Sequence, residues 1–129
     1  MTFTENIYAK IKNLAYLSTD EFSQSWLGQS RSYYSSNKAR GIEASNAALM
    51  KLMNKLIEHK SMLEADTRNT FLLKSAEKYE LLAREVGREL ANRSLAADIA
   101  SGPANVMLIK IFSELNEQKT PSALPLFTN

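Results

Sequence analysis

The segment formed by residues 22–41 most constrains the fold of this 129-residue chain, because its pattern predicts two helices joined by a sharp turn. Phe22 and Trp26 stand four residues apart, so they share one face of a helix. Gly28 then permits the positive φ that a sharp turn requires. Ser30 is well suited to cap a second helix, since its hydroxyl can accept from a free backbone N–H two or three residues later.

The second helix, expected from about Arg31 to Arg40, opens with small polar and basic side chains. A helix, a tight turn and a capped second helix with a polar, basic start form the layout that presents a helix to the DNA major groove. The residues expected to face DNA are Arg31, Ser32, Tyr33, Ser35, Ser36, Lys38 and Arg40. A serine-rich, solvated helix start remains the alternative for the first residues. For Lys38 and Arg40 the alternative is a structural role at the negative end of the helix dipole.

This segment resembles the helix-turn-helix motif of the phage-repressor family (Cro/repressor, XRE-type). That family commonly reads L-G-x-S-x-S-Y-hydrophobic-S, and the matching residues here are Leu27, Gly28, Ser30, Ser32, Tyr33, Tyr34 and Ser35. The likeness extends to about Lys60 and departs from the family pattern at Gln24, Asn37 and Arg40. It implies a helical bundle that binds duplex DNA, with Tyr34 as a packing residue and Trp26 as an anchor between helices.

The chain has only four Gly and three Pro, and few β-branched residues, so we expect an all-α fold. The expected architecture is a four-helix N-terminal helix-turn-helix bundle followed by a long helix and a short, apolar C-terminal helix. The expected helices cover residues 4–16, residues 18–27 behind a capping-box signature, residues 31–40 ended by Gly41, a fourth helix capped by Ser45, residues 66–100, and a sixth helix from Pro103.

The long helix carries apolar residues at heptad spacing, namely Leu72, Ala76, Tyr79, Ala83, Val86 and Leu90. This seam has two interpretations, because it can pair with a second chain or pack against the N-terminal bundle of its own chain. The last helix is apolar over much of its circumference, which predicts burial between elements or between subunits. We therefore expect three units: a DNA-binding domain at 1–62, a dimerisation or packing extension at 63–118, and a flexible tail at 119–129.

Little in the sequence favours an enzyme or a cofactor site. The chain has no Cys, and His59 is the only histidine; its charged neighbours Glu58 and Lys60 favour a surface position. No phosphate-cradling Gly loop or metal-ligand spacing occurs, so we expect no enzymatic activity, no cofactor, no metal and no small-molecule ligand. No signal peptide or membrane span is expected, and the lack of Cys is compatible with a cytoplasmic location.

A modest basic bias in the first half of the chain has two interpretations, phosphate binding or chance variation in composition. Up to Lys60 there are eight basic and five acidic residues, although the net charge of the whole chain is only +2. The leading hypothesis is a sequence-specific transcription regulator that binds double-stranded DNA as a homodimer. The alternative is a non-enzymatic helical adaptor or anti-activator that binds another protein through its C-terminal helices.

Overall fold

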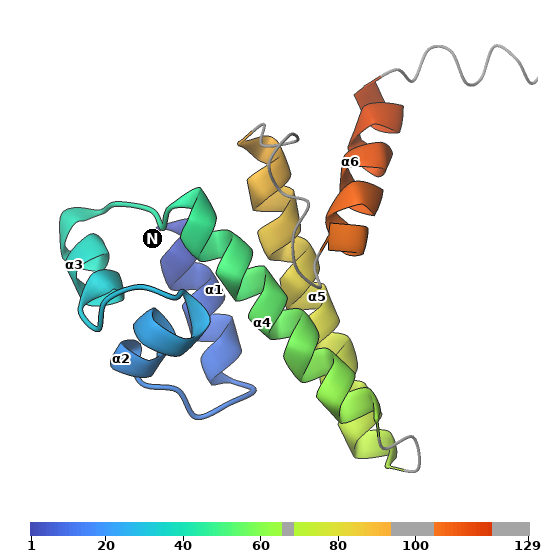
Figure 1. Ribbon diagram of the computed structural model, residues 1–129, viewed down its shortest axis with the longest axis horizontal. Coiled ribbons are helices and arrows are strands. Elements are labelled where there is room, and N and C mark those ends of the chain that lie inside the picture. Colours follow the sequence, from blue (N-terminus) through green and yellow to red (C-terminus); the bar gives the residue numbers. More distant parts are fainter. Residues whose placement is uncertain (66–68, 94–104, 120–129) are drawn as a thin grey trace, which may run out of the picture.

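The computed structural model describes residues 1–65, 69–93 and 105–119, and every regular element in these ranges is helical (Figure 1). The all-α prediction is therefore confirmed. The elements are α1 (Phe3–Lys12), α2 (Thr19–Glu21), the π-helical turn η1 (Phe22–Trp26), α3 (Tyr33–Arg40), α4 (Asn46–Glu64), α5 (Thr70–Asn92) and α6 (Asn105–Lys119).

Helix α1 is shorter than the expected range of residues 4–16. Thr2 and Glu5 form a reciprocal capping box at its start, and the helix ends at Lys12. The chain then reverses, and the Tyr8 hydroxyl donates a hydrogen bond of 2.8 Å to the carbonyl oxygen of Leu17. This buried bond holds residues 13–17 in a turn, so the apolar residues there cannot continue the helix.

Helices α4 and α5 run in opposite directions, and their contact is the most extensive one between described elements (Figure 1). Ser45 caps α4 as predicted, and the Asn69 side chain caps α5 by accepting from the N–H groups of Phe71 and Leu72. From Ala76 to Leu90 the predicted heptad positions of α5 are buried, while Leu72 is half-buried. Of the two interpretations of the seam, the structure shows packing within one chain. Residues 66–68 and 94–100, also expected in this helix, and Pro103, the expected start of the next one, lie outside the described ranges.

Helix α6 packs against α5 on the side of the molecule remote from α2 and α3 (Figure 1). Its buried Leu108 and Ile111 lie over Gly87 of α5. A Cβ atom at residue 87 would lie 2.6 Å from Cδ1 of Ile111 and 2.9 Å from Cε of Met53, so a larger residue there would require these two side-chain ends to shift. The expected burial of the last helix therefore holds for this face only, since Val106 and Ile109 of the same helix are mostly exposed.

The buried apolar side chains form one cluster that runs from Ile7 of α1 to Ile111 of α6. The expected units 1–62 and 63–118 both contribute to it, and of the expected tail only Lys119 lies in the described part of the chain. No helix among the described residues combines the length and the apolar character needed to cross a membrane.

Candidate nucleic-acid interface

The turn before α3 has the backbone that the sequence predicts. Gly28 has φ +67°, a conformation that residues with a side chain rarely adopt. The preceding turn is wider than an α-helical one, because the N–H of Leu27 donates to the carbonyl of Phe22 five residues earlier at 2.9 Å. Gly41, with φ +65°, ends α3 as expected.

The start of α3 differs from the prediction. The helix begins at Tyr33, and no side chain at its N-cap residue, Ser32, makes a capping hydrogen bond. Ser30 contributes its backbone carbonyl, which accepts from the N–H of Tyr33 at 3.1 Å. The hydroxyl of Ser23 in η1 takes the capping role by accepting from the N–H of Tyr34 at 3.0 Å. The cap is therefore supplied by the preceding helix.

Tyr34 anchors α3 to the rest of the molecule. Its ring is buried and lies 4.8 Å from the ring of Tyr8 and 5.3 Å from that of Phe22, measured between centroids. Burial, with smaller contributions from Glu5 and Tyr8, raises the pKa of the Tyr34 hydroxyl to about 12. The predicted packing role of Tyr34 is confirmed, and this anchor fixes which face of α3 points outward.

The outward face of α3 and of the residues just before it is polar. The exposed residues there are Arg31, Ser32, Ser35, Ser36, Lys38 and Arg40. Arg31 makes only a loose ion pair with Asp20, 3.9 Å long, and both side chains are mostly exposed. Tyr33 differs from the other candidate residues, because it is half-buried and its hydroxyl accepts from the N–H of Ser45 at 2.8 Å.

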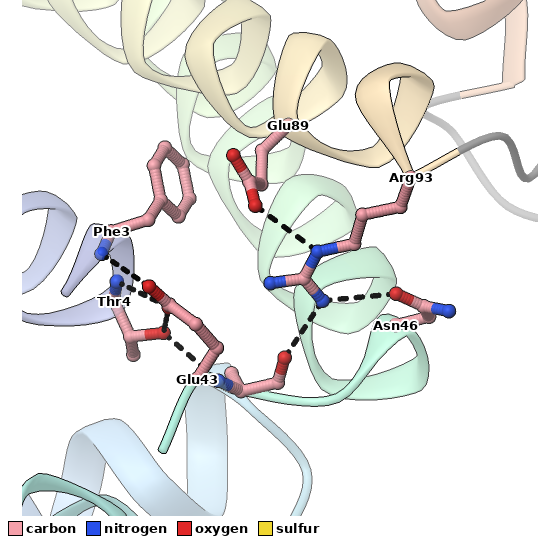
Figure 2. A network of polar contacts seen from close by, with 7 residues as sticks. Phe3, Thr4, Glu43, Asn46, Glu89 and Arg93 are labelled. Atoms are coloured by element: carbon pink, nitrogen blue, oxygen red, sulfur yellow. Dashed lines mark hydrogen bonds and ion pairs between the residues drawn. The ribbon is translucent and has the colours of Figure 1, made fainter. Parts of the chain in front are cut away.

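Glu43, the acidic residue nearest in sequence to this face, forms its hydrogen bonds with the start of α1. From residue 22 to residue 57 the only acidic residue is Glu43. Its carboxylate accepts from the backbone N–H groups of Phe3 and Thr4 at 2.7 and 3.1 Å, and from the Thr4 hydroxyl at 2.8 Å (Figure 2). Burial acts to raise the pKa of Glu43, but these hydrogen bonds and nearby Arg93 outweigh it and leave the pKa below its usual value.

Two lysines of α4 extend the basic character toward the turn. They are not among the residues predicted from the sequence to face DNA. The aliphatic part of Lys51 lies beside Gly28, where an added Cβ would come within 3.1 Å of its Cγ. Lys51 and Lys55 line a small cleft of about 140 Å³ together with Ser25 and Glu58. Lys51 and Lys55 are four residues apart, so the sequence could have predicted that they share one face of a helix. Nothing in the sequence predicts that this face of α4 lies against the turn.

Trp26 is an anchor between helices, as predicted, whereas His59, which was expected at the surface, is half-buried. The His59 ring lies between Trp26 and Tyr79, with centroid distances of 4.7 and 5.4 Å. Burial and nearby Lys55 lower the pKa of His59, and Glu58 opposes them. A lowered pKa favours the neutral ring at pH 7, which suits a packing role between two aromatic side chains.

Comparison with known proteins identifies a family without assigning a function. A model described as "Family of unknown function (DUF6626)" matches residues 4–99, which is most of the chain, so the chain belongs to this family. The matched range includes α1–α5 and the whole candidate interface. No curated protein and no solved structure matches the chain.

Proposed function

We propose that this DUF6626 member is a transcription regulator that binds duplex DNA as a homodimer, with α3 and its flanking residues as the reading surface. One observation carries the proposal. Between residues 22 and 57 the sequence holds five basic residues and a single acidic one, Glu43, whose carboxylate is held by the start of α1. The outer face of α3 thus combines exposed cations with short hydroxyl groups. That combination suits contacts to phosphates and to base edges.

The dimensions of α3 suit a groove but limit how much DNA one copy can read. Eight residues at a rise of about 1.5 Å give a helix about 12 Å long, which is comparable to the width of the major groove. Arg31 can reach guanine O6 and N7 or a phosphate, and the serines offer short hydrogen bonds. A single short helix contacts few base pairs. Two copies reading half-sites about 10 bp apart supply the missing affinity and specificity.

Fluorescence anisotropy of labelled duplexes tests the proposal. One duplex carries the DNA upstream of the chain's own gene, and the other is a shuffled sequence of the same composition. We expect the first to bind more tightly, and both affinities to fall as NaCl is raised. If all five basic residues from Arg31 to Lys55 meet phosphates, the slope of log K against log salt is at most about −4.5 per subunit.

Substitutions in and beside α3 test whether DNA binds at this helix. Lys38→Ala with Arg40→Ala should weaken both duplexes alike and reduce the salt slope by about 2 per subunit. Arg31→Ala should cost roughly 1–3 kcal/mol on the specific duplex and less on the shuffled one. The matched control is Lys110→Ala, an exposed lysine of α6. Unchanged DNA affinity in folded α3 variants, or no salt-dependent binding by the wild type, would refute the assignment.

The alternative function, a helical adaptor, is favoured by two exposed apolar residues on α6. Val106 is 77% exposed and Ile109 is 57% exposed, so the outer face of α6 offers apolar surface to a protein partner. An adaptor of this kind would bind its partner through α6 and show no salt-sensitive affinity for duplex DNA. The anisotropy measurement therefore separates the two functions.

A further inference from the structure

A groove of about 330 Å³ lies between α1 and α5 and is lined only by residues of these helices and of the turn that follows α1. Its lining combines leucines with charged side chains, and the residues that matter are Lys10, Leu14, Lys78, Leu81, Leu82 and Glu85. Leu82 is buried, whereas Leu81 is 63% exposed. Within the chain, α4 covers the heptad seam of α5, and α5 covers Leu108 and Ile111 of α6.

Along this face of α5 the basic residues come first and the acidic residues last. Lys74 and Lys78 lie toward the start of the helix, Leu81 and Leu82 lie in the middle, and the acidic residues Glu85 and Glu89 follow. At 3.6 residues per turn these positions fall on one stripe about 100° wide. A helix face with cations at one end, acidic groups at the other and leucines between them is complementary to itself when two copies run antiparallel.

We propose that this face of α5 binds the same face of a second copy of the chain, antiparallel about a two-fold axis between Leu81 and Leu82. In that register Leu81 of each copy meets Leu82 of the other. Lys78 faces Glu85 across the axis, and farther out Lys74 faces Glu89. The inference rests on the homodimer part of the proposed function and names its surface.

The ion pairs within one chain are compatible with this arrangement. Lys74 and Lys78 form no ion pair with another described residue. Lys10 engages only Oε1 of Glu85, at 2.6 Å, and the Nε of Arg93 engages Oε2 of Glu89, at 3.1 Å. The second oxygen of each glutamate therefore retains its acceptor capacity for a lysine of the other copy. Because much of the contact is charged and near solvent, dimerisation should weaken as salt is added.

Sedimentation equilibrium of the full chain tests the surface without DNA. We expect the wild type to approach twice the chain mass of 14.5 kDa as its concentration rises, and to dissociate in high salt. Lys78→Glu and Glu85→Lys should each raise the dimer dissociation constant roughly tenfold or more, because both symmetry-related pairs become like-charged. An equimolar mixture of the two variants should associate again, since every cross-axis pair is then of opposite charge.

Two apolar substitutions locate the interface. Leu81→Asp should give a monomer with an unchanged circular dichroism spectrum, because Leu81 is mostly exposed in the single chain. Met62→Asp is the matched control, since Met62 is 69% exposed near the end of α4 and outside the groove. A wild type that stays monomeric at all soluble concentrations overturns the inference, while DNA binding by that monomer is measured separately. A dimer that resists Leu81→Asp but is split by Ile109→Asp of α6 also overturns it.

Discussion

Glu43 acts on two parts of the molecule at the scale of a single residue. Its carboxylate satisfies two free N–H groups at the start of α1, where the helix dipole also favours a negative charge (Figure 2). The same contacts tie the segment between α3 and α4 to α1. Next to Glu43, Arg93 donates to the carbonyl oxygen of Ala44 at 2.8 Å. The segment that follows α3 is thus held by the start of α1 and by Arg93 at the end of α5.

Replacing Glu43 by Gln should destabilise the protein by about 1–3 kcal/mol at pH 7, since hydrogen bonds to a charged acceptor are replaced by weaker ones. The pKa of Glu43 is lowered in the folded state. Its stabilising contribution is therefore complete above the ordinary value of 4.5 and is lost as the pH falls through the folded value.

Urea denaturation at several pH values checks this prediction. The difference in unfolding free energy between the wild type and Glu43→Gln should be largest near neutral pH and should shrink below about pH 4.5. Glu77→Gln on the exposed side of α5 is the control and should change stability little at any pH. A difference that stays constant from neutral to acid pH would contradict the role given to the carboxylate.

The sequence predicted residues whose roles depend on near neighbours. Gly28 and Gly41 were predicted from turn chemistry, and Tyr34 from its place in a motif; both glycines have positive φ, and the tyrosine is buried. Glu43 and His59 were not predicted, because their partners lie far along the chain. Glu43 bonds residues 39 and 40 positions away, and His59 stacks on rings from η1 and α5.

At the scale of elements, the α2–η1 segment and α3 depend on each other through one hydroxyl. Ser23 is fully buried, donates to the carbonyl of Thr19 at 2.9 Å, and accepts from the N–H of Tyr34 at 3.0 Å. The four-residue separation of Phe22 and Trp26 predicts a helix here. It does not predict the π-helical turn, because side chains four residues apart lie near one face in an α-helical or a π-helical turn. The source of the cap of α3 was therefore not visible in the sequence.

Ser23→Ala should destabilise the protein by about 1–2 kcal/mol, because it leaves the buried N–H of Tyr34 without an acceptor. Ser25→Ala is a matched control two residues away, where the side chain is exposed and should contribute less than about 0.5 kcal/mol. Thermal denaturation of both variants makes the comparison. Equal melting temperatures for the two variants would show that α3 is not capped from η1.

At the scale of the whole molecule, amphipathic patterns predicted where helices lie but neither all of their bounds nor which surfaces meet. The spacing from Leu72 to Leu90 is the same whether the seam packs on α4 or on a second chain, so only the structure distinguishes the two. Because this seam is buried under α4, the proposed dimer contact uses the charged face of α5 beside α1 instead.

The docking of α6 on α5 gives the most direct test of the whole arrangement, because two isoleucines of this helix differ mainly in position. Ile111 is 1% exposed and lies over Gly87, whereas Ile109 is 57% exposed. Ile111→Ala should leave a cavity and cost about 2–5 kcal/mol, and Ile109→Ala should change stability by less than about 0.5 kcal/mol. Urea denaturation at a protein concentration where the chain is monomeric removes any contribution from dimerisation. Similar losses in both variants would mean that α6 does not use this face, and the core would then end at α5.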